Sequence, residues 1–258
     1  MSVALVTGAA KRLGRAMALH LAAQGHDLAI HYAGSAEAAE ATASDARALG
    51  VKARTFQADL LDAGRAAELI PEIAAAMGQL HVLVNNASIF EYDNIRSATM
   101  EGWDRHIGSN LRAPFQLIQA FAAQAPAPLR DEAGEPVAQA LVVNIVDQRV
   151  LKPTPEFMTY SVAKAALWSL TRTAAQALAP AIRVNAIGPG PTLIGSRQSE
   201  SHFAAQRANT ILGRGSDPEG IVRALAFFLE SPAVTGQLIC VDGGQHLAWR
   251  TPDVLGRE

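Results

Sequence analysis

Short apolar runs alternate with longer amphipathic stretches along the whole chain. Runs rich in β-branched residues, such as 3–6 and 141–146, are typical of strands buried on both faces. The stretches between them repeat apolar residues every three or four positions, which is typical of helices packed on one side. We expect strands at residues 3–6, 28–31, 51–57, 80–84, 141–146, 182–187 and 237–241. We expect helices from residue 13 to about 25, at 37–49, 63–77, 103–124 and 218–229, and around Tyr160 as far as Leu178.

The alternation of these elements has the spacing of repeated βαβ units, which predicts an α/β protein with a parallel sheet. We expect a single-domain, Rossmann-type, doubly wound parallel sheet over residues 1–258, flanked by helices on both faces. No linker divides the chain, and no internal repeat is visible. The polar stretch 126–136 is interpreted as a solvent-exposed loop. The stretch 192–215 is longer than a connection requires, which is typical of a lid over a substrate site.

Composition narrows the functional classes. Hydrophobic residues make up 49% of the 258 residues and charged residues 18%, which favours a large core over disorder. The net charge of -2 argues against a nucleic-acid or anionic-membrane partner. The single cysteine, Cys240, excludes an internal disulfide, and we interpret it as a small core residue. No leader and no membrane-length apolar run is visible, so we expect a cytoplasmic protein. The histidines show no metal-ligand spacing, so no metal site is predicted.

The first strand runs into the sequence TGAAKRLG, from Thr7 to Gly14. A glycine turn before a helix lets the free N–H groups of the helix face a phosphate. The GxGxxG fingerprint is absent, because only Gly8 and Gly14 of this turn are glycines. The turn is nevertheless the first βα connection of the sheet, which is where doubly wound proteins bind dinucleotides. A dinucleotide site is therefore predicted here.

The end of the second strand indicates which dinucleotide binds. Proteins that use NAD place an acid there to hold the ribose 2′-hydroxyl, whereas this strand ends in His31 and Tyr32. Lys11, Arg12 and His31, with Ser35, are expected to cluster around a 2′-phosphate instead. Positive charge at a helix N-terminus is unfavourable unless an anion lies there. We therefore expect NADPH as the cofactor.

The candidate chemistry follows the strand at 141–146. Tyr160 and Lys164 are four residues apart and share one face of the predicted helix. An ammonium beside a phenol lowers the pKa of the phenol, which favours proton transfer near neutral pH. Asp147 follows the strand at its carboxyl end, where open α/β sheets place their chemistry. These three residues form the predicted catalytic centre.

Together these features resemble the short-chain dehydrogenase/reductase family. The matching motifs are TGAAKRLG, Asn85-Asn86-Ala87, Asn110, Tyr160 with Lys164, Gly188-Pro189-Gly190 and Val241-Asp242-Gly243-Gly244. The resemblance implies hydride transfer with a nicotinamide cofactor and assembly into dimers or tetramers, and we expect a homotetramer. It also implies that Tyr160 donates the proton, that Lys164 holds the nicotinamide ribose, and that Asn110 supports a water. The expected cofactor contacts are Gly8, Lys11, Arg12, Leu13, Gly14, His31, Tyr32, Ser35, Asp59, Leu60, Asn86, Ala87, Ser88, Lys164, Pro189 and Gly190.

One departure from the family pattern is informative. Most members carry serine thirteen residues before the catalytic tyrosine, and here that position is Asp147. A carboxyl group takes up and passes on a proton, which suits a substrate that is protonated at a ring nitrogen, such as one with a C=N bond. Pteridine reductases of the family share this aspartate. They also carry an aromatic residue, here Phe90, that sandwiches the pterin against the nicotinamide.

The resemblance to pteridine reductases implies substrate contacts at Arg12, Ser88, Phe90, Asp147 and Tyr160. The sequence therefore predicts an NADPH-dependent enzyme that reduces a C=N bond of a pterin-type small molecule. Two alternatives stay open. One is a general carbonyl or quinone reductase on the same scaffold, and the other is a non-catalytic dinucleotide-binding regulatory protein. Gly34, where these reductases often carry an arginine near the 2′-phosphate, weakens the expected preference for NADPH.

Overall fold

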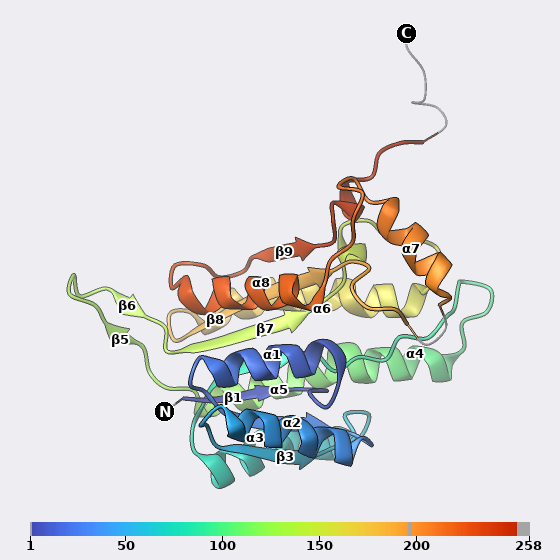
Figure 1. Cartoon of the computed structure of the whole chain (residues 1–258). Helices are drawn as coiled ribbons and strands as arrows, with labels where there is room; N and C mark the ends of the chain where they lie inside the picture. The colour runs from blue at the N-terminus through green and yellow to red at the C-terminus, as the bar shows by residue number, and fades with distance from the viewer. Residues whose placement is uncertain (1, 196–197, 252–258) are drawn as a thin grey trace.

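A seven-stranded sheet forms the centre of the protein in a computed structural model, which describes residues 2–195 and 198–251. The strands are β1 (Val3–Val6), β2 (Asp27–Tyr32), β3 (Ala53–Gln57), β4 (Leu80–Asn85), β7 (Ala140–Ile145), β8 (Ile182–Pro189) and β9 (Leu238–Val241). Their order is β3-β2-β1-β4-β7-β8-β9, and every neighbouring pair is parallel. The expected single-domain Rossmann-type sheet is confirmed (Figure 1).

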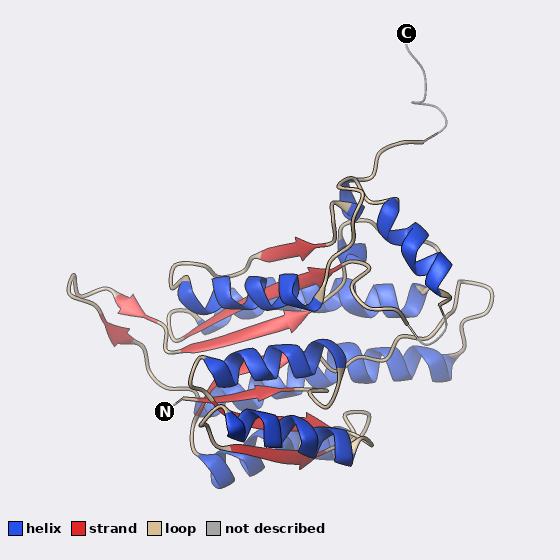
Figure 2. Cartoon of the chain, in the orientation of Figure 1, coloured by secondary structure: helices blue, strands red, loops and turns tan. Residues whose placement is uncertain are grey.

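Helices cover both faces of this sheet (Figure 2). Helices α1 (Arg12–Ala23), α2 (Ala36–Ala48) and α8 (Pro218–Glu230) pack one core on one face. Helices α3 (Ala63–Met77), α5 (Ala113–Gln124) and α6 (Met158–Leu178) pack a second core on the other face. Both cores are built from the apolar positions that the three-to-four-residue periodicity predicts.

The direction in which strands are added reverses at β1. The chain adds β2 and β3 on one side of β1, then crosses to its other side to add β4 and β7. Such a reversal opens a crevice at the carboxyl ends of the two central strands, because their following connections turn away in opposite directions. The turn at Thr7, the segment after Asn85 and the loop after Ile145 all begin at this edge of the sheet. The sheet thereby gathers the predicted site residues.

The helix expected at 103–124 is three consecutive pieces. Helix α4 (Met100–Ile107) leads into a π-helical turn, Gly108–Arg112, which leads into α5. A π turn inserts an extra residue per turn and is often found at functional sites. A pattern of apolar positions does not reveal it, because the same helix face stays buried on either side of the turn.

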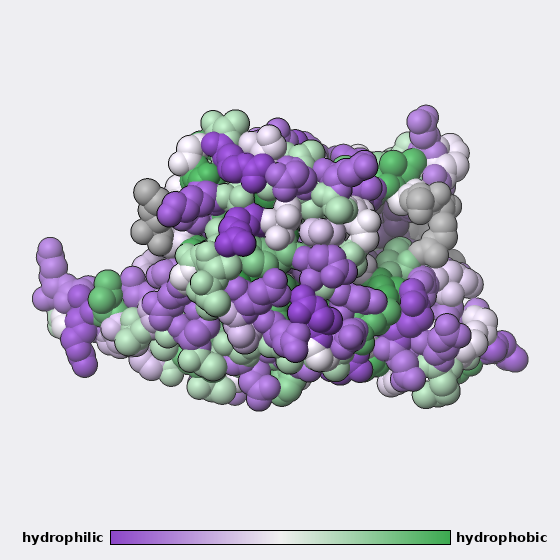
Figure 3. Space-filling view, turned by 90° about the horizontal axis from the view of Figure 1, so that it is seen from below, coloured by the Kyte–Doolittle hydropathy of each residue, from purple (hydrophilic) through white to green (hydrophobic). Residues whose placement is uncertain are grey.

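Two further segments differ from the sequence expectation. The stretch 126–136 holds a short antiparallel hairpin of β5 (Leu129–Arg130) and β6 (Pro136–Val137), which projects from one side of the molecule (Figures 1 and 3). The predicted lid at 192–215 contains helix α7 (Glu200–Ala208). Positions 196–197 of the lid lie outside the described residues. In Figure 1, α7 lies beyond the carboxyl edge of the sheet.

Cys240 is half-buried, so its expected place in the core is wrong. It lies on β9, an edge strand whose residues are all half-buried. Burial and the nearby carboxylates still raise the pKa of its thiol to about 12, which keeps the thiol protonated and unreactive. Among the described residues, no helix is long and apolar enough to cross a membrane.

Candidate active site

The turn after β1 is shaped by two glycines. Gly8 has a φ of +62°, which L side chains rarely adopt. At Gly14, a Cβ atom would lie 2.3 Å from the carbonyl oxygen of Gly8, so any side chain there would clash with the backbone of the turn. The two glycines let the start of α1 pack directly under the turn. This close packing fixes the N-terminus of α1 beside the turn.

The turn is also tied to the segment after β4. The Thr7 hydroxyl accepts hydrogen bonds from the backbone N–H groups of Asn86 and Ala87, both at 2.9 Å. The Asn86 side-chain amide donates to the Thr7 carbonyl at 2.8 Å. Thr7 therefore joins the two loops of the site, a role that was not expected from the sequence. Its signal was a polar residue directly after an apolar strand, at the position where the two central strands meet.

His31 does not take its expected place in a phosphate cluster. Its ring is buried, and Nδ1 accepts the N–H of Gly8 at 3.0 Å while Nε2 lies 3.0 Å from the carbonyl oxygen of Ala58. Burial lowers the pKa of His31 to about 4, so the ring is neutral near pH 7. Both nitrogens are occupied, and the ring carries no charge for a phosphate. His31 instead braces the glycine turn.

Lys11 and Arg12, by contrast, are exposed at the N-terminus of α1. The first turn of this helix holds no acidic residue, and the N-cap makes no side-chain hydrogen bond. The free N–H groups of the first turn and two cations therefore lie at the same end of the helix, which suits phosphate groups. The Arg12 guanidinium also donates to the carbonyl oxygens of Leu193 and Ile194, at 3.2 and 2.9 Å. This contact joins the first turn to the start of the 192–215 segment.

The other expected cofactor contacts lie near the starts of α1 and α2 and at or just after the ends of β2, β3 and β8. Leu13, Tyr32 and Ser35 are half-buried, Asp59 is exposed and Leu60 is buried. Pro189 ends β8, and a Cβ atom at Gly190 would lie 2.6 Å from the Cα atom of Asp242. Gly190 is therefore required by the close approach of the segment that follows β9.

Tyr160 and Asp147 form a direct hydrogen bond. The Tyr160 hydroxyl donates to Asp147 Oδ2 at 3.0 Å, and the backbone N–H of Arg149 donates to Oδ1 at 2.9 Å. Burial raises the pKa of Asp147 above its ordinary value, while Arg149, its own hydrogen bonds and Lys164 act in the opposite direction. The two predicted catalytic residues therefore form one hydrogen-bonded pair that holds a shared proton.

Lys164 is buried next to this pair. Its ammonium donates to the carbonyl oxygen of Ile145 at 2.7 Å and lies 5.7 Å from the centre of the Tyr160 ring. Burial lowers the pKa of Lys164 to about 8. The expectation that Lys164 lowers the pKa of Tyr160 is wrong in this structure. Burial and the charge of Asp147 raise that pKa well above its ordinary value, so Tyr160 carries a hydroxyl proton near pH 7.

Asn110 lies in the π turn and is completely buried. Its amide nitrogen donates to the carbonyl oxygen of Ile89 at 2.8 Å, and its Oδ1 accepts the N–H of Ile89 at 2.9 Å. These two bonds fix the backbone between Ser88 and Phe90. The side chain of Asn110 thus positions the loop that carries two predicted substrate contacts. Its expected support of a water remains a prediction.

Phe90 reaches the catalytic pair from this loop. Its ring lies edge-on to Tyr160, with centroids 4.7 Å apart, and stacks on Phe157 at 4.3 Å with the planes 10° apart. Phe90 is 42% exposed, so it is not a buried core residue under a loop. Ser88 beside it is also exposed. Phe157, with a φ of +52° at the start of α6, was not found from the sequence because its position depends on that backbone conformation.

The chain is similar to known proteins along nearly its whole length. The family profile described as Enoyl-(acyl carrier protein) reductase matches residues 8–246. The 3-oxoacyl-[acyl-carrier-protein] reductase FabG of Staphylococcus aureus is 34% identical over 249 residues, covering 95% of this chain and 98% of the relative. The crystal structure of FolM Alternative dihydrofolate reductase 1 from Brucella suis in complex with NADP is 42% identical, with a TM-score of 0.90 and 98% of both chains covered. A Burkholderia cenocepacia short chain dehydrogenase in complex with NADP is 31% identical, with a TM-score of 0.85 and coverage of 95% and 97%.

The chain belongs to the short-chain dehydrogenase/reductase family. It is an oxidoreductase of that family that uses NADP(H). The residues present fit this cofactor, because the first turn of α1 holds no acidic residue, its N-cap makes no side-chain hydrogen bond, and the two cations Lys11 and Arg12 stand at the same helix end. Among the described residues, no group of three or more histidine, cysteine, aspartate or glutamate side chains could hold a metal ion.

The preference for NADPH over NADH is tested at Lys11. Replacing Lys11 with alanine is expected to weaken NADPH binding about 10- to 100-fold and to leave NADH binding nearly unchanged, because a charge-assisted bond to a phosphate contributes about 1.5–3 kcal/mol. Fluorescence titration measures both dissociation constants. Lys52→Ala, which removes an exposed lysine beside β3, is the matched control. Equal losses for both cofactors would contradict a role of Lys11 at the 2′-phosphate.

Proposed function

We propose that the protein is an NADPH-dependent reductase of a C=N bond in a pterin-type substrate. The observation that carries this proposal is the 3.0 Å hydrogen bond between Tyr160 and the carboxylate of Asp147. A family member with serine at this position holds an uncharged hydroxyl beside the tyrosine. Here a group that gains and loses a proton stands there instead.

The chemistry of C=N reduction suits this pair. When bound, NADPH supplies the hydride that the carbon accepts. The ring nitrogen is basic and takes a proton from the Tyr160 hydroxyl as the hydride arrives, so that no net negative charge builds on the substrate. Asp147 is hydrogen-bonded to that hydroxyl and returns a proton to it from solvent. In carbonyl reduction, an ionised Asp147 would instead repel the negative charge that grows on the substrate oxygen.

Flat aromatic substrates suit the surroundings of the pair. Phe90 presents a partly exposed ring beside Tyr160, and offset stacking of aromatic rings contributes about 0.5–1.5 kcal/mol beyond area burial. Arg12 and Ser88, both exposed at the same crevice, are the proposed polar contacts of the substrate. The 42% identity to a protein titled an alternative dihydrofolate reductase supports a pterin-type substrate.

Carbonyl reduction is the second candidate function. It is favoured by the 34% identity over nearly the whole chain to 3-oxoacyl-[acyl-carrier-protein] reductase. The two candidates differ in what they require of Asp147, because a carboxylate assists protonation of nitrogen and opposes charge on oxygen. A non-catalytic regulatory protein, the third possibility, would bind NADPH without oxidising it.

Phe90 provides a direct test of the proposed substrate class. Replacing Phe90 with alanine is expected to weaken the binding of dihydrobiopterin to the NADP-loaded protein about tenfold, because stacking and apolar burial are both lost. Isothermal titration calorimetry measures the affinity. Phe227→Ala is the matched control, since Phe227 on α8 is 47% exposed and lies away from Tyr160. An unchanged pterin affinity in Phe90→Ala would count against a stacked pterin.

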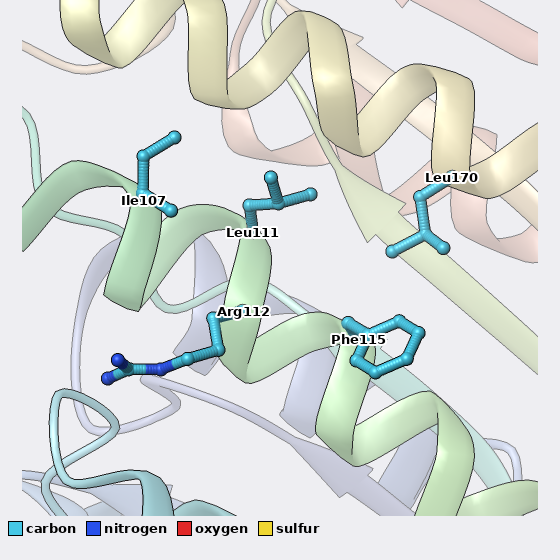
Figure 4. A pocket seen from close by; sticks show the side chains of 5 residues that line it. All are labelled: Ile107, Leu111, Arg112, Phe115 and Leu170. Atoms are coloured by element: carbon cyan, nitrogen blue, oxygen red, sulfur yellow. The ribbon is translucent and has the colours of Figure 1, made fainter. Parts of the chain in front are cut away.

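The chain also carries a surface suited to self-assembly, and we propose that it forms a homotetramer. A pocket between α6 and the continuous helical segment of α4, the π turn and α5 is lined by Ile107, Leu111, Arg112, Phe115 and Leu170 (Figure 4). Most of these side chains are apolar, and the Phe115 side chain is about half exposed at 48%. Covering this surface with a second copy would bury apolar area that water now contacts, and would join the copies of the proposed tetramer in pairs.

A further inference from the structure

Arg149 lies against both halves of the active site. It sits in the 3₁₀ turn Gln148–Val150 that directly follows Asp147. Its Nη1 atom lies 3.7 Å from Asp147 Oδ2, the oxygen that accepts the Tyr160 hydroxyl. Its guanidinium carbon lies 5.1 Å from the Phe157 ring centre and 5.6 Å from the Phe90 ring centre. One side chain therefore contacts the acid–base pair and the aromatic stack together.

We infer that Arg149 is a positioning residue that holds Asp147 as a carboxylate, so that the proton of the pair rests on the Tyr160 oxygen. The inference rests on the proposed function in one respect only, namely that the Tyr160 proton passes to a ring nitrogen of the substrate. Arg149 does not need to touch the substrate for this role. It acts through Asp147 by charge and through Phe90 and Phe157 by stacking.

Among the charged and titratable groups around Asp147, Arg149 has the strongest effect in keeping the carboxyl group ionised. Tyr160 and Lys164 face the carboxylate from α6, and the charge of Asp147 in turn raises the pKa of the Cys240 thiol on β9. The thiol of Cys240 is neutral, and the ammonium of Lys164 is engaged with the carbonyl oxygen of Ile145. Of the charges that lower the pKa of Asp147 toward its ordinary value, Arg149 acts most strongly.

The position of Arg149 also restricts its own movement. Its side chain is only 18% exposed and packs against two rings, and an arginine over an aromatic face gains cation–π attraction. Its backbone N–H is bonded to the same carboxylate at 2.9 Å. The guanidinium is therefore held near Asp147, and a flexible surface cation would not have this effect.

A titration of Asp147 tests the inference without relying on turnover. The carboxyl carbon of Asp147 is followed by ¹³C NMR from low to high pH in protein labelled at aspartate, with Asp147→Asn identifying the signal. Arg149→Met keeps packing against the rings and removes the charge. Arg149→Gln is a second neutral variant, in case methionine disturbs folding. Both are expected to move the midpoint of Asp147 to higher pH, whereas Arg149→Lys stays near the wild-type midpoint.

The matched control is Arg172→Met. Arg172 also lies over an aromatic ring, that of Trp168, and is exposed on α6. It is expected to leave the Asp147 midpoint unchanged. A midpoint that stays unchanged in both neutral variants, or that moves as far in Arg149→Lys as in Arg149→Met, would overturn the inference. A midpoint that moves in a protein that reduces no pterin would leave the inference standing and refute the proposed function.

Discussion

Replacing Tyr160 with phenylalanine is expected to lower kcat about 10³-fold, because general-acid catalysis by a positioned group contributes about 10²–10⁴-fold. The ring would still contact Phe90 and Lys164, so packing is preserved while the hydroxyl proton is lost. The variant keeps the glycine turn and both cations at α1, so its affinity for NADPH should stay within about twofold of wild type. Steady-state NADPH oxidation and fluorescence titration measure the two quantities.

The control for this substitution is Tyr92→Phe. Tyr92 is 53% exposed and contacts Phe157 rather than Asp147. Its hydroxyl has no place in the proton transfer, so activity should remain within about twofold. Tyr160→Phe with more than a tenth of wild-type kcat would show that another group donates the proton. It would remove Tyr160 from its catalytic role.

Replacing Asp147 with serine is expected to cost about 10²-fold in pterin turnover, because the partner that returns a proton to Tyr160 is lost. Any activity on ketones or aldehydes should fall by less than about threefold, or rise. The repulsion between Asp147 and a developing negative oxygen is removed at the same time. Measuring kcat for pterins and for carbonyl compounds, in the wild type and in Asp147→Ser, gives the loss of turnover on each substrate class.

Asp147→Asn distinguishes the effect of the size of the side chain from the effect of its ability to bind a proton. The amide keeps the size of the carboxyl group and can accept the N–H of Arg149, but it does not exchange a proton in the working pH range. Its pterin turnover should be as low as that of the serine variant. Equal losses on pterins and carbonyl compounds in Asp147→Ser would contradict the proton relay.

The sheet could be predicted from the sequence because its strands are short, apolar and evenly separated by amphipathic helices. Segments without that signal were missed. Strands β5 and β6 have two residues each, which is too few to show an alternation. Helix α7 has no buried residue, so it shows no apolar face in the sequence. The π turn at Asn110 leaves the helical face unchanged and adds a residue that periodicity does not register.

Some features of the candidate site could also be predicted from the sequence, and others could not. The pairing of Asp147 with Tyr160 followed from their positions after a strand and on a helix, and the structure brings them together. The direction of the Tyr160 pKa did not follow, because it depends on which charge lies nearest to the hydroxyl. His31 was misassigned because burial cannot be read from residue type. Arg149 and Phe157 were missed because a 3₁₀ turn and a positive φ bring them to the site.

The most direct test of the central claim is NADPH oxidation by the purified protein with a panel of substrates. The panel contains dihydrobiopterin, dihydromonapterin and dihydrofolate, together with simple aldehydes, ketones, quinones and a 3-oxoacyl thioester. We predict turnover of at least one pterin-type substrate, with kcat/KM at least tenfold above that of every carbonyl compound. Turnover of the carbonyl compounds alone would leave the fold and the cofactor in place and would contradict the assignment of a C=N bond as the target.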